Sequence, residues 1–259
     1  MEHISQNIPI LFEDSQILVM NKPPGLVINR AESVKEPTLQ DWMEAQSWYG
    51  NWDTSYGDED VALYRSRSGV AHRLDKDTSG VMVLAKNPAS LIELMRQFRD
   101  RETQKTYCAL VHGKFSTQSG TVNLPLARNV GNRERFTVDP EGRESETEYK
   151  VLDFFPHAPA YLGQKKTMSY QGFSLVELKP KTGRTHQIRV HMAYIKHPLV
   201  GDEKYVGRKR SRVDGEWCPR QFLHAKQLCF THPVTKEHHC IEAKLPEDLE
   251  KVLTLLTNQ

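Results

Sequence analysis

Runs of apolar residues divide the chain into short strands separated by polar turns. The segments 10–14 and 17–22 predict two strands around a turn, and Pro23-Pro24-Gly25 closes them with a bend. The wholly apolar run at 81–85 predicts a buried strand. Alternation in 106–111 predicts another strand, with every second residue on one face.

Three helices are predicted from capping residues and 3.6-residue periodicity. Thr38 and Asp41 form an approximate capping box before a helix over 39–49. Asn87 can cap a second helix, and Pro246 opens a third. Apolar residues recur at helical spacing in these last two helices: Leu91, Leu94, Met95 and Phe98, then Leu249, Val252, Leu253 and Leu256.

Other segments lack a period and are predicted as loops. Residues 51–69 are rich in Gly, Ser, Asp and Tyr, and 156–170 resemble an insertion between strands. The basic run 208–212 lies between Gly207 and Gly215, so we expect a loop there too. This loop is either simply solvated or faces RNA, and its charge favours RNA.

Composition is that of an ordinary globular protein. The 259 residues are 38% hydrophobic and 26% charged, with a net charge of only +2, and we expect one domain over 1–259. No apolar stretch approaches the roughly 18 residues of a membrane helix, and Met1-Glu2-His3-Ile4 does not resemble a signal peptide. A cytoplasmic protein is therefore expected, with no membrane partner.

The cysteines and histidines give no pattern typical of a metal site. The four cysteines are widely separated without a C-x-x-C pair, so free thiols are expected. Neither His186 with His191 nor His238-His239-Cys240 has i, i+4 helix spacing or a set of four ligands. We expect no metal.

Candidate chemistry gathers in the segment His72-Arg73-Leu74-Asp75-Lys76-Asp77-Thr78-Ser79-Gly80. Acid, base, hydroxyl and glycine lie here on the loop that leads into the buried strand. The same residue types also suit a tight turn without chemistry, because their side chains bond nearby backbone. From this segment alone, both interpretations of Asp75 and Asp77 stay open.

The segment resembles the signature of the RluA-type pseudouridine synthases, in which the Asp at the position of Asp75 is the catalytic carboxylate. Further segments resemble the family's other motifs in the same order, over about residues 10–245: Asn21-Lys22-Pro23-Pro24-Gly25, 105–113, 182–191, 197–202, and Leu223-His224-Ala225 with His232-Pro233. Several separated motifs in order are far more specific than one short string.

The resemblance implies an α+β fold, with a long mixed, mostly antiparallel sheet, helices and loops around it and a central cleft. It implies an RNA uridine isomerase without cofactor. Asp75 would be the catalytic residue, Arg189 its counter-cation and Tyr107 the ring that stacks on uracil. Arg73 would fill the gap left by a flipped base.

The remaining assignments concern substrate binding. Leu223 would supply an apolar wall to the pocket. His72 and Arg184 are also assigned to substrate binding. The basic residues expected on the RNA path are Lys209, Arg210 and Arg212. Residues before Asn21 are too few for the small N-terminal RNA-binding module (S4) of some relatives.

Two other classes of function remain open. A non-catalytic RNA-binding or RNA-folding protein on the same scaffold would not need Asp75. A hydrolase acting on a small nucleoside would need a pocket that excludes polymeric RNA. The intact acid, Arg and Tyr argue against the first, and the basic run against the second. We expect a monomer acting on ribosomal RNA, transfer RNA or both.

Overall fold

The computed structural model describes residues 8–52, 55–167 and 170–257. The first four residues, on which the signal-peptide prediction rests, lie outside the described residues. The chain forms two compact units: unit 1 comprises Met1–Gln104 and Gln227–Ala243, and unit 2 comprises Lys105–Lys226 and Lys244–Gln259. Among the described residues, no helix has the length and apolar character needed to cross a lipid bilayer.

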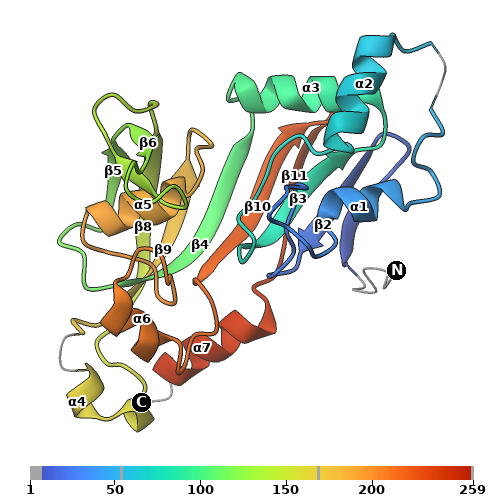
Figure 1. Ribbon diagram of the computed structural model, residues 1–259. Coiled ribbons are helices and arrows are strands. Elements are labelled where there is room, and N and C mark those ends of the chain that lie inside the picture. Colours follow the sequence, from blue (N-terminus) through green and yellow to red (C-terminus); the bar gives the residue numbers. More distant parts are fainter. Residues whose placement is uncertain (1–7, 53–54, 168–169, 258–259) are drawn as a thin grey trace. The chain divides into compact units, whose positions relative to one another are not determined.

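Unit 1 is built on antiparallel strands covered by helices (Figure 1). In order across the sheet the strands are β1 (Ile10–Glu13), β2 (Ile17–Lys22), β3 (Ser79–Ala85), the later part of β10 (Leu223–Thr231) and β11 (His238–Glu242). The helices are α1 (Leu39–Glu44), α2 (Asp58–Arg67) and α3 (Pro88–Arg99), and α2 contacts α3.

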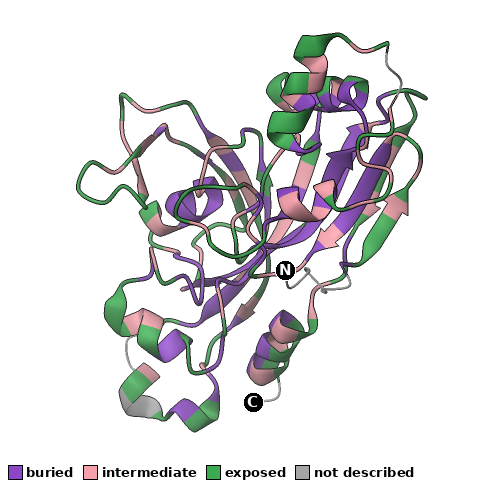
Figure 2. Ribbon diagram, turned by 45° about the vertical axis from the view of Figure 1, so that its right-hand side comes forward, coloured by how far each residue is buried: buried purple, intermediate pink, exposed green. Residues whose placement is uncertain are grey.

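The core of unit 1 lies against β2 and β3, which are buried along nearly their whole length (Figure 2). Alternate residues such as Val19 and Val83 pack with Leu91 and Leu94 of α3. Because the intervening residues are also buried, both faces of these strands are covered. The prediction of a buried strand at 81–85 is confirmed.

Unit 2 contains a second antiparallel set and a two-stranded ribbon. The set runs β4 (Gln104–His112), β9 (Phe173–Pro180), β8 (Glu146–Phe155) and β5 (Ser119–Asn123), and the ribbon is β6 (Leu126–Arg128) with β7 (Phe136–Val138). Its helical elements are η1 (Ala160–Leu162), α4 (Gln164–Thr167), α5 (Gln187–Tyr194), α6 (Arg208–Asp214) and α7 (Glu247–Thr257). The fold is therefore α+β, as expected.

Capping chemistry predicted the helix starts well. Thr38 and Asp41 form the complete capping box of α1, and the Asn87 side chain accepts from the backbone N–H of Ser90 at the start of α3. The last predicted helix is α7, which buries Leu249, Val252 and Leu256. The end of α1 was predicted too late, because it stops at Glu44 rather than at 49.

All three segments predicted as loops contain helical elements, and in 156–170 these are η1 and α4. Residues 51–69 include α2, in which Tyr64 is the one residue buried, so no apolar stripe marked it. The basic run belongs to α6, where Gly207 and Gly215 are the caps of a helix rather than signs of a loop. Arg and Lys are good helix formers, and seven residues are too few to show a period.

The expectation of four free thiols is also wrong. Cys229 on β10 and Cys240 on β11 form a disulfide with Cα atoms 4.1 Å apart, because the antiparallel register places them directly opposite each other. Sequence separation alone could not reveal this register. Cys108 and Cys218 are free thiols, as expected.

Candidate active site

Asp75 lies in unit 1 on the loop between Val70 and β3. The loop turns tightly there, since the backbone N–H of Thr78 donates to the carbonyl of Asp75 at 3.1 Å. Asp75 is half-buried, whereas Asp77 on the same turn is exposed, and the following Thr78 is buried. Two carboxylates two residues apart therefore have different surroundings.

Lys22 at the end of β2 fixes this loop from within. Its side chain is completely buried, and its ammonium donates to the carbonyl oxygens of Lys76, at 2.8 Å, and Pro23, at 2.7 Å. The backbone N–H of Gly25 donates to the same Lys76 carbonyl at 2.9 Å. The Asn-Lys-Pro-Pro-Gly motif thus ties the backbone next to Asp75 to the sheet.

The residues preceding Asp75 face in different directions. His72 stacks on Phe98 of α3, with ring centroids 4.3 Å apart, and its Nε2 accepts from the backbone N–H of Val83 at 3.1 Å. Leu74 is buried, while Arg73 between them is exposed. His72 and Leu74 therefore anchor the loop, and Arg73 is presented to solvent.

In unit 2 the structure brings Tyr107 and Leu223 into one apolar cluster. Tyr107 on β4 pairs with Leu178 on β9 and is half-buried. The cluster also contains Ile188, the residue before Arg189 on α5. The ring of Tyr107 thus has the rigid apolar support that a stacking residue needs.

Arg189 is buried and paired with Asp202. Its Nε donates to Oδ2 of Asp202 at 2.7 Å and its Nη2 to Oδ1 at 2.9 Å, a two-point geometry that fixes the guanidinium plane. Asp202 is itself oriented by the backbone N–H of Lys204 at 3.0 Å. The guanidinium also lies 5.2 Å from the ring centroid of Tyr205.

The start of α5 is held by Gln187. Its side-chain oxygen accepts from the hydroxyl of Thr182, at 2.7 Å, and from the backbone N–H of Arg184, at 3.0 Å. Its side-chain nitrogen donates to the carbonyl of Glu146 at 2.8 Å and to the Thr147 hydroxyl at 3.0 Å. These bonds fix the helix that carries Arg189.

His191 is a structural residue of the same helix. Burial lowers the pKa of His191, which favours the neutral ring with one N–H. Its Nε2 donates to the carbonyl of Leu124 at 3.0 Å, and its Nδ1 accepts from the hydroxyl of Thr147 at 2.9 Å. Ser145 donates to the same Leu124 carbonyl at 2.6 Å and lies 3.1 Å from Nε2 of His191.

The remaining basic residues are also in unit 2. Arg184 is half-buried and donates through Nε to the carbonyl of Glu144 at 3.1 Å. On α6, Lys209 and Arg212 are exposed, and the guanidinium of Arg210 lies 5.6 Å from the ring centroid of Tyr170.

Asp214 anchors α6 in the interior of unit 2. It is fully buried and accepts from the hydroxyl of Tyr170 at 2.6 Å, and it lies 2.8 Å from Nε2 of His112. The backbone N–H of Gly201 donates to it at 3.2 Å. These hydrogen bonds fix the position of α6 and therefore of its basic side chains.

Two buried residues, one in each unit, were missed by the sequence analysis. Lys22 and Asp202 both lie in segments that resemble family motifs, yet neither received a role. A lysine that ends a mostly apolar strand was the available signal for Lys22. Nothing in the sequence showed that Asp202 pairs with Arg189, because thirteen residues separate them.

Known proteins identify the family. Residues 16–194 match the model of the RNA pseudouridylate synthase family. The chain is 38% identical over 247 residues to the uncharacterized RNA pseudouridine synthase YlyB of Bacillus subtilis. This match covers 95% of this chain and 72% of that protein. The chain is 35% identical over 248 residues to ribosomal large subunit pseudouridine synthase C of Vibrio vulnificus, covering 95% and 69%.

Solved structures agree with the sequence matches. The human RNA pseudouridylate synthase domain containing 4 superimposes with a TM-score of 0.67 at 25% identity, over 96% of this chain and 93% of that chain. The chain therefore belongs to the RNA pseudouridylate synthase family. It is of the RluA type, and it is an isomerase.

Proposed function

We propose that this protein converts specific uridines of ribosomal RNA to pseudouridine in the cytoplasm, with Asp75 as the catalytic residue. The observation that carries the proposal is the match, over 95% of the chain, to a relative named as a ribosomal large subunit pseudouridine synthase. The firmly held loop around Asp75 supports it, because a reacting group must be kept in position.

The chemistry requires little besides one carboxylate. The bond between ribose C1′ and uracil N1 breaks, the base turns, and C1′ bonds to C5. The C5 hydrogen leaves as a proton, and N1 takes up a proton. No group is transferred and nothing is oxidised or reduced overall, so the chemistry does not by itself demand a metal or cofactor. Asp75 acts as a nucleophile on the sugar or base, or removes a C2′ proton.

Tyr107 and Leu223 form the apolar part of the proposed uracil site. A half-buried tyrosine within an apolar cluster can stack on a planar base without large motion. Leu223 supplies a wall, and together they exclude water from the detached base.

Arg189 is proposed to hold the catalytic carboxylate in its ionised form, the role that the family resemblance implies. A cation has this effect only when it is held in place, and Asp202 holds Arg189 at two points. We therefore propose Asp202 as a positioning residue for the reaction.

RNA is proposed to bind through exposed cations. Arg73 is exposed beside Asp75 and would occupy the space left when the target uridine flips out. Lys209 and Arg212 on α6 would contact phosphates, and Arg184 and Arg210 would add to this charge. These contacts position the RNA and are separate from the chemical step.

Mapping of pseudouridines tests the proposal in cells. Ribosomal and transfer RNA should be compared from cells that carry the wild-type protein, the Asp75→Asn variant or neither. We expect specific ribosomal sites that depend on the wild-type protein alone. Sites found only in transfer RNA would replace the substrate class, and sites retained with Asp75→Asn would contradict the assigned catalytic residue.

A further inference from the structure

We propose that the β10–β11 hairpin is a redox-controlled zinc site. In the reduced protein, Cys229, Cys240 and His238 bind one Zn²⁺, and the disulfide is the oxidised, metal-free state of the same residues. None of these three residues is assigned to the isomerisation, so the site is additional to that function.

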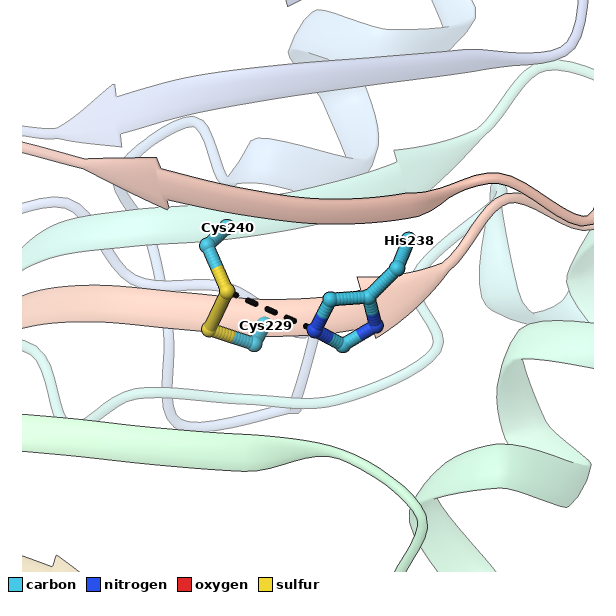
Figure 3. A group of neighbouring side chains, drawn as sticks. All are labelled: Cys229, His238 and Cys240. Atoms are coloured by element: carbon cyan, nitrogen blue, oxygen red, sulfur yellow. Dashed lines mark hydrogen bonds between the residues drawn. A yellow bond between two sulfur atoms is a disulfide. The ribbon is translucent and has the colours of Figure 1, made fainter.

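The pairing of the two strands brings the three side chains together (Figure 3). Cys229 lies opposite Cys240, and His238 precedes Cys240 by two residues, which places it on the same face of β11. Nε2 of His238 is 3.5 Å from Sγ of Cys240. The donor atoms of all three residues lie within 4.8 Å of one another.

The donor set and its spacing suit zinc. Two thiolates and one imidazole are typical zinc ligands, with Zn–S near 2.3 Å and Zn–N near 2.0 Å, so the two sulfurs on a tetrahedral ion are roughly 3.8 Å apart. Reduction separates the sulfurs to a non-bonded contact of similar length, with the Cα atoms remaining in strand register. Solvent can supply the fourth ligand because His238 and Cys240 are exposed.

The hairpin itself is well supported. Its opposite face carries Leu228 and Phe230, which are buried in the core of unit 1. On the face of the cysteines, Gln227 donates to Glu242 at 2.7 Å in the next cross-strand pair. The three ligands therefore keep their backbone positions whether or not the disulfide is closed.

The other cysteines are poor competitors for a metal ion. Burial raises the pKa of the Cys108 thiol to about 11 and that of Cys218 to about 12, whereas zinc binds the thiolate form. Cys240, in contrast, is exposed. Among the four cysteines, all of which the structure describes, the proposed site thus contains the exposed one.

The exchange between the two states balances. The thiolate of a small dithiol attacks the exposed Sγ of Cys240, and Cys229 leaves as a thiolate. The second thiol of the reductant then displaces Cys240, so the reductant becomes a cyclic disulfide and the protein a dithiol. Zn²⁺ binds the two sulfurs and releases their two protons.

Cobalt(II) is the probe that tests this site, because thiolate-to-cobalt charge transfer reports bound sulfur and intense d–d bands report tetrahedral geometry. Tag-free full-length protein should be titrated before and after reduction by a phosphine, which carries no thiol. Zinc affinity is then measured by competition with a chromophoric chelator. The variants are Cys240→Ser and His238→Ala, with Cys108→Ser and His157→Ala as controls for a cysteine and an exposed histidine elsewhere.

We expect reduced wild type and both controls to bind one cobalt with the charge-transfer band, and unreduced protein to show none. Cys240→Ser should lose the band. His238→Ala, which leaves the cysteines intact, should weaken zinc binding at least about tenfold, since even outer-shell partners contribute 10–100-fold. Absence of the band in reduced wild type, or equal zinc affinity in His238→Ala, would overturn the proposal.

Discussion

Arg189 and Asp202 form a two-point ion pair in the interior of unit 2, with side chains that are only 7% and 0% exposed. Removing one member of such a pair leaves a buried charge without its partner, which costs about 3–5 kcal/mol. The pair therefore stabilises unit 2 only while both members remain, and it fixes the direction of the guanidinium.

Asp202→Asn should lower both stability and catalysis. We expect the free energy of unfolding to fall by about 3 kcal/mol and the single-turnover rate per folded molecule to fall at least about tenfold. Asp248→Asn is the control, because Arg220 and Asp248 also form a two-point pair in the same unit, at 2.7 and 3.2 Å, with Asp248 32% exposed. The same loss of rate per folded molecule in Asp248→Asn would show that the effect does not depend on the orientation of Arg189 by Asp202.

Lys22→Met tests whether the loop of Asp75 is held by the buried ammonium. Methionine keeps an unbranched apolar side chain but cannot donate to the carbonyls of Lys76 and Pro23. We expect a single-turnover rate at least about tenfold lower, with RNA affinity nearly unchanged. Lys86→Met is the control, since the Lys86 ammonium also donates to a backbone carbonyl, that of Asp14 at 2.7 Å. Equal rates for the two variants would show that the Lys22 ammonium does not position the loop of Asp75.

The pH dependence of stability should carry a contribution from His191. Burial lowers its pKa in the folded state, so below about pH 6.5 the unfolded chain binds more protons than the folded one. Stability should therefore be lost as pH falls below about 6.5, by up to about 1.4 kcal/mol per pH unit from this residue. Denaturant unfolding at a series of pH values measures the slope.

His191→Gln should be less stable at neutral pH but should show a flatter slope between about pH 6.5 and 5.5. The exposed His157→Gln should leave the wild-type slope unchanged. A slope for His191→Gln as steep as that of wild type would contradict a neutral, buried His191.

Sequence patterns predicted those elements whose information is local. Three predictions depend only on neighbouring residues, and each was confirmed: the capping box at Thr38, the cap at Asn87 and the apolar strand at 81–85. Helix α2 was missed because it buries a single side chain. Helix α6 was missed because its supports, including Tyr170 and His112, come from elsewhere in the chain.

The site followed the same division. Motif resemblance predicts roles for Asp75 and Arg189 from short segments, and these roles stay predictions. The pairing of Arg189 with Asp202 depends on how a helix meets a loop. The disulfide depends on the register between β10 and β11, which no single segment contains. Long-range register and burial are properties of the folded chain, so they had to be read from the structure.

The exposed cations of α6 should affect binding but not chemistry. Lys209→Ala with Arg212→Ala should weaken RNA binding and reduce the log–log salt slope by about 0.7–0.9 for each lost phosphate contact. The single-turnover rate on saturating RNA should barely change. Lys244→Ala with Lys251→Ala removes the same charge from an exposed part of unit 2 and should have little effect. A loss of rate at unchanged salt slope would place α6 in the active site instead.

The catalytic role of Asp75 is tested most directly by comparing Asp75→Asn with Asp77→Asn. Both substitutions remove the same charge from the same turn. Tritium release from RNA labelled at uridine C5 measures the reaction, because C5 loses its hydrogen when it bonds to the sugar. We predict that Asp77→Asn releases tritium at nearly the wild-type rate, while Asp75→Asn binds RNA and releases none. An Asp75→Asn rate within tenfold of wild type, about 1.4 kcal/mol in barrier, would contradict the assignment of Asp75 as the catalytic residue.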